Sequence, residues 1–203
     1  MMSEGIFKVG ITGGIGVGKT TIAKIFHLLG IALYNADEQA KLLVTKNMEL
    51  KDSILQLLGT QSYGEDGSYN RAFVAQKVFD QPLILQQLNS LIHPAVANDF
   101  ETWCKNQSST YVLKEAALLV ESGSYKALDK LIVVTAPLAI RIARIEQRDQ
   151  RSVEEIKSII DRQLTDEKKI AEADFVISND NHSLVIPQVL AIDAQLRLLS
   201  KRF

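Results

Sequence analysis

The chain has 203 residues, 46% of them hydrophobic and 23% charged, and its formal net charge is −1, a balance typical of one ordinary globular domain. This near-neutral charge argues against a nucleic-acid partner. No apolar run approaches the ~18 residues that a membrane span needs. No signal-peptide pattern is visible, and Cys104 is a lone cysteine, so we expect a cytoplasmic protein with no membrane partner.

The first 35 residues predict a strand, a glycine loop, a helix and a second strand. Ile6–Ile11 is an apolar-rich run of strand length, and Ile31–Tyr34 is another. Between them, apolar residues from Ile22 to Leu29 recur at helical spacing, and Gly30 follows as a stop signal. This order is the βαβ unit of a parallel sheet.

Helical patterns dominate the next segment, about residues 37–107. They cover Glu38–Val44, Met48–Leu58 and residues 71–103, with the turn-rich run Gly59–Asn70 between the second and the third. Pro94 predicts a kink or break in the last of them. We interpret the segment as a helical insertion at the carboxyl edge of the sheet.

Three further strands are predicted at Thr110–Leu113, Leu131–Thr135 and Phe175–Ser178. Helices are expected between and after them, at residues 137–148, 153–163, 166–173 and 184–200, and Ser152 with Glu155 forms a capping-box pattern. About five short strands alternating with helices predict an α/β fold with a doubly wound parallel sheet. Ligands of such sheets bind beyond the carboxyl ends of the strands.

The loop after the first strand matches the phosphate-binding pattern G-x-x-x-x-G-K-[ST] from Gly13 to Thr20. Its backbone amides and the following helix N-terminus would bind a polyphosphate. Lys19 would reach the β- and γ-phosphates, and the Thr20 hydroxyl would ligate Mg²⁺. The dinucleotide fingerprint G-x-G-x-x-G fails, because Lys19 and Thr21 stand where it needs glycine. A glycine-rich turn without a ligand is the alternative.

Several classes of protein carry such a loop. The guanine-reading motif N-K-x-D is absent from the sequence, which weighs against a GTPase. A short chain with a helical insertion after the second strand and an arginine-bearing helix late in the sequence is typical of a small-molecule kinase. The sequence therefore predicts a P-loop kinase that uses ATP.

Two acids follow predicted strands. Asp37 could accept the proton of an attacking hydroxyl, or it could be the N-cap of the next helix, and the residues alone leave both open. Glu115 could organise Mg²⁺ or be a surface acid. His93, which precedes Pro94, could contact a substrate or belong to a helix break.

Arginines recur at helical spacing late in the chain, at Arg141, Arg144, Arg148 and Arg151. No acid lies four residues after the first three of them, so this face would repel itself unless an anion compensates. A triphosphate would do so, since guanidinium groups suit bidentate contacts to oxygen. Arg144 and Arg148 are favoured for this contact, and a solvated basic face is the alternative.

At this point the sequence resembles the dephospho-CoA kinase family over nearly its whole length. The segments that carry the resemblance are GITGGIGVGKTT (Gly10–Thr21), NADEQA (Asn35–Ala40), LNSLIHP (Leu88–Pro94), ALLVE (Ala117–Glu121), RIEQRD (Arg144–Asp149) and AEADFVISND (Ala171–Asp180). Asn35 replaces the first acid of the family's D-A-D segment, and Ala117 replaces the proline of its P-L-L segment. Their joint order and spacing make the resemblance specific.

The resemblance implies roles for individual residues. Asp37 would be the base that acts on the ribose 3′-hydroxyl of dephospho-CoA, with Lys19 and Arg144 also catalytic. ATP would be bound by Gly14, Ile15, Gly16, Val17, Gly18, Lys19, Thr20, Thr21, Arg144 and Arg148, the two arginines belonging to a mobile lid. The acceptor would be bound by Asp37, His93, Leu118, Leu119 and Glu121, and Mg²⁺ by Thr20 and Glu115. Gln163 matches a glutamine that follows the lid.

We therefore expect one kinase domain over residues 1–203, with a core at about 1–36, 108–140 and 173–203, an acceptor-binding insertion at 37–107 and a lid at 141–172. The implied reaction transfers the γ-phosphoryl of ATP to dephospho-CoA, giving CoA and ADP, the last step of coenzyme A synthesis. The expected partners are these two substrates with Mg²⁺, and the expected state is a monomer or weak homo-oligomer. A kinase for a nucleoside monophosphate or a shikimate-like alcohol, or a nucleotide switch without transfer chemistry, are the alternatives.

Overall fold

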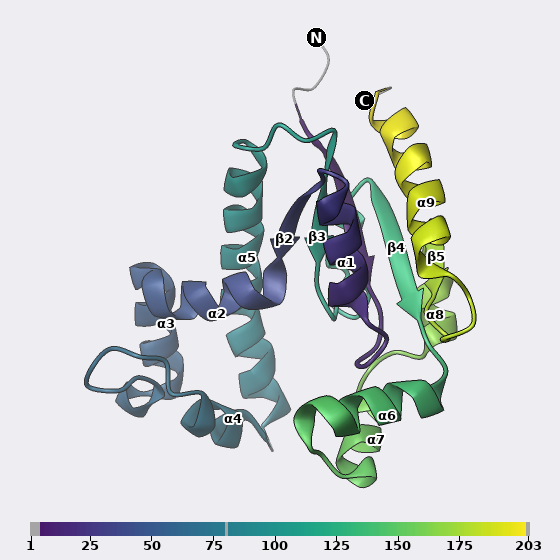
Figure 1. Ribbon diagram of the computed structural model, residues 1–203. Coiled ribbons are helices and arrows are strands. Elements are labelled where there is room, and N and C mark those ends of the chain that lie inside the picture. The colour runs from purple at the N-terminus through teal and green to yellow at the C-terminus, as the bar shows by residue number, and fades with distance from the viewer. Residues whose placement is uncertain (1–4, 80, 202–203) are drawn as a thin grey trace. The chain divides into compact units, whose positions relative to one another are not determined.

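Residues 5–79 and 81–201 are described by the computed structural model (Figure 1). They divide into two compact units. We call the first the sheet unit; it contains the residues up to Asn35 and those from Lys105 onward. The second, the helical unit, is Ala36–Cys104 and nearly coincides with the segment expected as an insertion.

The sheet unit is built on five parallel strands, as predicted. They are β1 (Phe7–Thr12), β2 (Ala32–Asn35), β3 (Tyr111–Glu115), β4 (Lys130–Thr135) and β5 (Phe175–Ser178), in the order β2-β3-β1-β4-β5. Glu115 pairs in register with Ile11 of β1 and with Asn35 of β2. The carboxyl ends of three strands therefore meet at one edge of the sheet.

One face of the sheet is covered by α1 (Lys19–Leu28) and α9 (Val185–Ser200), which contact each other (Figure 1). Alternate residues of each strand point to this face, because the side-chain period of a strand is two. The fully buried members of this core include Val9, Ile11, Phe26, Ile132, Val134, Ile177, Val189 and Leu196. Burying each such side chain contributes about 1.5–3 kcal/mol. The last predicted helix, expected at residues 184–200, is confirmed as α9.

The opposite face is closed partly by the chain after β3. Gly10 in β1 has no side chain, and a Cβ at this position would lie 2.7 Å from Leu128 and 2.9 Å from Leu119. The loop therefore packs directly on the strand backbone. A short helix, η2 (Ser124–Ala127), lies within this connection.

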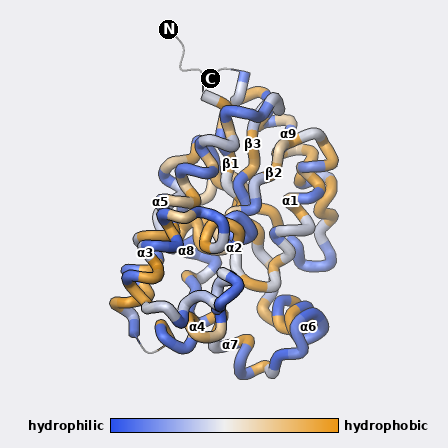
Figure 2. Tube along the Cα trace, turned by 90° about the vertical axis from the view of Figure 1, so that its left-hand side faces the viewer, coloured by the Kyte–Doolittle hydropathy of each residue, from blue (hydrophilic) through white to orange (hydrophobic). Residues whose placement is uncertain are grey.

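Three helices follow β4 before the last strand: α6 (Leu138–Asp149), α7 (Val153–Asp161) and α8 (Asp166–Ile170). Figure 2 shows α6 as largely hydrophilic with hydrophobic residues interspersed, and its last four residues are all hydrophilic. The capping box at the start of α7 is confirmed, with Ser152 Oγ accepting from the Glu155 amide at 3.2 Å and Glu155 accepting from the Ser152 amide. The expected end of α7 at Gln163 is wrong, because this helix ends at Asp161, whereas α6 ends within one residue of the expected position. Arg151 lies beyond the end of α6 and therefore does not share its face.

The helical unit contains α2 (Ala36–Lys46), α3 (Met48–Leu58), η1 (Thr60–Ser62), α4 (Arg71–Phe79) and α5 (Pro82–Cys104). Asn47 caps α3 by accepting from the Leu50 amide at 2.9 Å. Apolar residues including Leu50, Ile54 and Leu88 form the core of this unit. Of the kink or break expected at Pro94, the break is wrong, since α5 continues through it, and the kink stays a prediction. Cys104 is buried.

Among the described residues, no helix has the length and apolar character required to cross a bilayer. The prediction that both units act as one kinase domain stays a prediction.

Candidate phosphate-binding site

The glycine loop lies between the end of β1 and the start of α1. Two of its glycines are required by close backbone approaches. A Cβ on Gly13 would lie 2.3 Å from the Val134 carbonyl oxygen. Gly16 has φ +82°, in the left-handed region, and its Cβ would lie 2.8 Å from the Arg141 carbonyl oxygen. Packing against β4 and α6 thus demands glycine at both positions, in addition to any ligand.

The start of α1 points its amides into this loop. The Ile22 amide donates to the Gly18 carbonyl at 3.1 Å. This hydrogen bond completes the first turn of α1. The amides of Lys19, Thr20 and Thr21 precede that bond and have no acceptor within the helix by geometry. A helix N-terminus of this kind binds anions.

A cavity of about 250 Å³ opens at this point. It is lined by Ile15, Gly16, Gly18, Lys19, Thr20, Thr21, Arg144, Ile145 and Arg148. All the residues expected to bind ATP are in that set except Gly14 and Val17, which are buried in the loop. The side chain of Val17 packs into the hydrophobic core and anchors the loop. Ile145 was not expected from the sequence and adds an apolar wall.

Two cations face the loop from different directions. Lys19 Nζ donates to the Gly14 carbonyl at 3.3 Å. Arg144 donates to the Gly16 and Val17 carbonyls at 3.5 and 3.3 Å, and to Asn181 Oδ1 at 2.6 Å. Lys19 and Arg144 therefore place positive charge against the backbone carbonyls of the loop.

The expectation that the arginine face lacks protein anions is wrong. Arg148 donates to both oxygens of the adjacent Asp149 at 2.7 and 2.8 Å, and this contact raises the pKa of Arg148 and lowers that of Asp149. Arg141 is buried and lies 3.5 Å from Asp166. Neither Asp149 nor Asp166 lies three or four residues after its arginine, so the helical spacing of the sequence does not reveal these pairs.

A polar cluster joins the loop to the carboxyl edge of the sheet. Thr20 Oγ1 donates to Glu115 Oε1 at 2.5 Å, and Asn35 Nδ2 donates to Glu115 Oε2 at 3.2 Å. The Glu115 residue is only 4% exposed, so the alternative of a surface acid is wrong. Hydroxyl and carboxylate oxygens are the ligands that Mg²⁺ prefers, and Mg²⁺ keeps most of its other ligands from phosphates and water. The donor set therefore fits this ion.

A denser metal site is not seen. Within the described part of the chain, no group of three or more His, Cys, Asp or Glu side chains is arranged to hold a metal.

The residues expected to bind the acceptor belong to different units. Asp37 and His93 lie in α2 and α5 of the helical unit, and both are exposed. Asp37 is the second residue of α2, so the alternative that it is the N-cap of this helix is wrong. Leu118 and Leu119 follow β3 in the sheet unit; Leu118 is 48% exposed, whereas Leu119 is buried. Their role in acceptor binding stays a prediction.

Glu121, also expected at the acceptor site, contacts the segment between α7 and α8. Its Oε1 accepts from the Leu164 amide at 3.3 Å and lies 2.8 Å from Lys169 Nζ. Lys169 is fully buried, so this is an interior ion pair.

The sequence did not predict that Arg141 and Gln163 contact the glycine loop. Gln163 Oε1 accepts from the Ile15 amide at 2.9 Å, and Arg141 Nε donates to the Ile15 carbonyl at 2.9 Å. The arginine spacing drew attention to Arg141, but no pattern in the sequence connects either residue to the loop.

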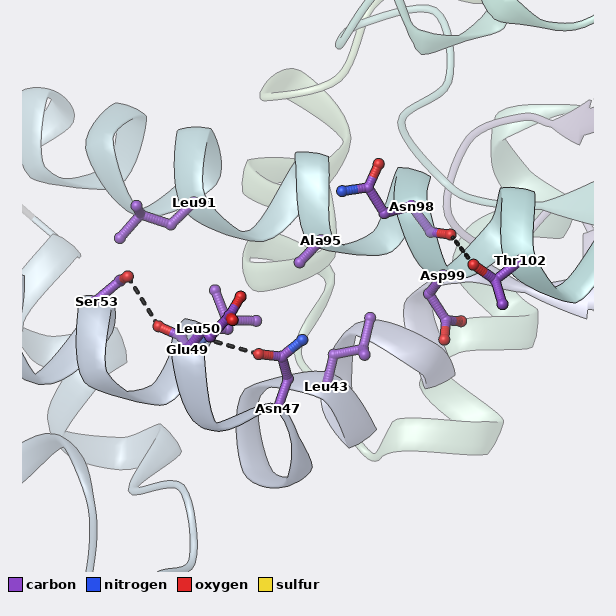
Figure 3. A pocket seen from close by; sticks show the side chains of 10 residues that line it. All are labelled: Leu43, Asn47, Glu49, Leu50, Ser53, Leu91, Ala95, Asn98, Asp99 and Thr102. Atoms are coloured by element: carbon purple, nitrogen blue, oxygen red, sulfur yellow. Dashed lines mark hydrogen bonds between the residues drawn. The ribbon is translucent and has the colours of Figure 1, made fainter.

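The helical unit has a cavity of its own, of about 390 Å³ (Figure 3). Several of its polar groups already serve the helices. Ser53 donates to the Glu49 carbonyl at 2.9 Å, Thr102 donates to the Asn98 carbonyl at 2.9 Å, and Asn47 is the cap of α3. The side chains of Ser53, Thr102 and Asn47 are therefore engaged within the helices that carry or follow them.

Comparison with known proteins agrees with this geometry. The family model described as dephospho-CoA kinase matches residues 7–184. A dephospho-CoA kinase of Bacteroides fragilis is 34% identical over 93% of this chain and 92% of its own length. A dephospho-CoA kinase of Salinibacter ruber is also 34% identical, over 85% of this chain and 88% of its own.

Solved structures show the same fold. A Thermus thermophilus protein aligns with a TM-score of 0.84 and 27% identity, over 95% of this chain and 99% of its own. A dephospho-CoA kinase from Campylobacter jejuni aligns with a TM-score of 0.66 and 26% identity, over 93% and 95% of the two chains.

Proposed function

This chain belongs to the dephospho-CoA kinase family, and from that premise we propose how its residues transfer the γ-phosphoryl of ATP to the 3′-hydroxyl of dephospho-CoA. One observation carries the assignment of residues. The glycine loop, the start of α1 and two arginines of α6 line one cavity, and the Thr20–Glu115 pair lies at its edge. These are the parts that phosphoryl transfer requires.

The loop binds and orients the phosphates. Amides from Gly16 to Thr21 donate to phosphate oxygens, and the dipole of α1 adds to the positive field. Lys19 exchanges the Gly14 carbonyl for a phosphate, and Arg144 and Arg148 approach from α6. Because these donors are fixed before the reaction, loss of one that contacts the transferred phosphoryl group is expected to cost about 10²–10³ in rate.

The metal-binding role falls to Thr20 and Glu115. The Thr20 hydroxyl would be a direct ligand, and the Glu115 carboxylate would orient it and bind the ion or its water. The chemistry that Mg²⁺ would supply there, if held by Thr20 and Glu115, is neutralisation of phosphate charge. Asn35 supports Glu115 by donating to its second oxygen.

Asp37 is the proposed general base for the acceptor hydroxyl. Asn35 ends β2 at the same sheet edge as Glu115, and Asp37 follows two residues later as the second residue of α2. Its exposed carboxylate would accept the proton of the ribose 3′-hydroxyl as that oxygen attacks the γ-phosphorus. His93, Leu118, Leu119 and Glu121 are proposed to contact the rest of the acceptor.

An acceptor panel tests this function. We expect ADP release and a 3′-phosphorylated product with ATP, Mg²⁺ and dephospho-CoA, and at least ~100-fold lower kcat/KM with nucleoside monophosphates or shikimate, because acceptor contacts position the attacking oxygen. Efficient transfer to one of the other acceptors would replace dephospho-CoA as the substrate. ATP binding without transfer to any acceptor would point to a nucleotide switch instead.

We also propose that the protein works in the cytoplasm as a monomer or weak homo-oligomer. Light scattering across a range of protein concentrations, with and without ATP, measures the oligomeric state directly.

A further inference from the structure

The backbone of Ile15 is held on both sides by residues that come from beyond β4. On one side, Gln163 Oε1 accepts from the Ile15 amide at 2.9 Å. On the other, Arg141 Nε donates to the Ile15 carbonyl at 2.9 Å. Ile15 directly precedes Gly16, where the phosphate-facing amides begin, so these two bonds act on the position of the whole loop.

The residues that hold Ile15 are themselves fixed. The side chain of Arg141 is 8% exposed and its Nη1 lies 3.5 Å from Asp166 Oδ1. Its guanidinium also occupies the space beside Gly14, where a Cβ would lie 2.3 Å from Nη2. A buried guanidinium with such neighbours has little freedom to move.

Gln163 is anchored through the next residue along the chain. The Leu164 amide donates to Glu121 Oε1 at 3.3 Å. The same oxygen lies 2.8 Å from Nζ of the fully buried Lys169, at ion-pair distance but without the alignment of a hydrogen bond. Separating two buried opposite charges is unfavourable, so this pair holds residues 164–169 against the loop that follows β3.

We propose that Gln163 is a positioning residue for nucleotide binding: it holds the phosphate loop through Ile15 and is in turn anchored by the Glu121–Lys169 pair. This inference rests on the nucleotide-binding role proposed above. The gain in ATP affinity arises from preorganisation, since a loop that is already fixed loses less conformational freedom when the phosphates bind. Arg141 assists from the opposite side of the same peptide.

Glu121 then has two possible actions with different kinetic signatures. As an anchor for Gln163 it would affect the affinity for ATP. As a direct contact to the acceptor it would affect the KM for dephospho-CoA. The two can be separated in one set of variants.

The test uses Gln163→Met, which keeps the side-chain length but removes the acceptor, and Gln163→Asn, which keeps the amide but is too short to reach Ile15. Gln147→Met is the matched control, because Gln147 is exposed on α6. Calorimetry gives the Kd for ATP, and steady-state kinetics give kcat and both KM values. We expect both Gln163 variants to raise the Kd and KM for ATP about three- to tenfold, the range of one net hydrogen bond. The KM for dephospho-CoA should stay within about twofold of the original value.

Glu121→Gln tests the anchor. If Glu121 acts through Gln163, Glu121→Gln should also weaken ATP binding, and combining it with Gln163→Met should add less than the sum of the single effects. A folded Gln163→Met or Gln163→Asn protein with unchanged ATP affinity would overturn the positioning role. The anchoring step would be overturned if Glu121→Gln changed only the KM for dephospho-CoA. It would also be overturned if the effect of Glu121→Gln on ATP affinity added fully to that of Gln163→Met. Failure of the unaltered protein to bind ATP would instead refute the proposed function.

Discussion

Glu115 is the residue on which the proposed metal site depends most. Its two oxygens accept from Thr20 and Asn35, and the group is buried. A second carboxylate at position 35 would repel Glu115 and favour a shared proton or cation. The amide of Asn35 instead donates to Glu115, which leaves one carboxylate charge to serve the metal.

Glu115→Gln should therefore weaken the response to Mg²⁺. Removing the carboxylate charge while keeping the side-chain shape is expected to raise the half-saturating Mg²⁺ concentration roughly 10- to 100-fold, as loss of a supporting carboxylate does at other metal sites. A Mg²⁺ titration of the reaction rate at fixed ATP measures this. An unchanged Mg²⁺ requirement would exclude Glu115 from the metal site.

Lys19 carries the charge expected to meet the transferred phosphoryl group. Lys19→Ala should lower kcat by about 10² or more, because it removes a preorganised charge from the transition state. Lys24→Ala is the control, since Lys24 is exposed on the same helix. Equal rates for the two variants would contradict the role of Lys19, and circular dichroism would check that both remain folded.

At the scale of elements, a buried polar network joins β3, α9 and the end of α1. The hydroxyl of Tyr111 donates to Asp193 Oδ1 at 2.8 Å, and Arg197 donates to Asp193 Oδ2 and to the Leu29 carbonyl, both at 2.8 Å. Burial and the neighbouring Asp193 raise the pKa of Tyr111 far above its usual range. The phenol therefore stays protonated and remains a donor.

Tyr111→Phe should destabilise the sheet unit by about 1–3 kcal/mol, because it leaves Asp193 Oδ1 buried without this donor. Tyr125→Phe is the matched control, since the hydroxyl of Tyr125 donates to exposed Glu172 and its loss should leave the free energy of unfolding nearly unchanged. Denaturant unfolding of both variants gives the two values. If the Tyr111→Phe protein were as stable as the Tyr125→Phe protein, the Tyr111–Asp193 hydrogen bond would not stabilise the sheet unit.

Most elements could be predicted from the sequence because their signals are local. The five strands are apolar runs of strand length, and α3 has the predicted bounds because both of its ends carry clear signals, Asn47 and Gly59. Pro94 does not end α5, because the packing of a long helix can compensate for the backbone hydrogen bond that proline removes. The bonds of Ile15 to Gln163 and Arg141 join residues more than a hundred positions apart, so no local pattern contains them.

At the scale of the whole molecule, the proposed chemistry is divided between the two units. The phosphate loop, Glu115 and the arginines belong to the sheet unit, while Asp37 and His93 belong to the helical unit. The family relationship covers both, since its match extends over residues 7–184. The central claim of the proposed function is therefore that Asp37 accepts the proton of the attacking hydroxyl.

Asp37→Asn tests that claim most directly, in a single-turnover measurement of phosphoryl transfer to dephospho-CoA with ATP affinity determined on the same sample. Loss of a general base lowers rates by about 10²–10⁴, and the loop that binds ATP is unaltered. We therefore expect transfer at least ~100-fold slower with the Kd for ATP within about twofold. Glu38→Gln, a change at the adjacent exposed acid, should leave both quantities unchanged. Near-normal transfer by Asp37→Asn would contradict the account.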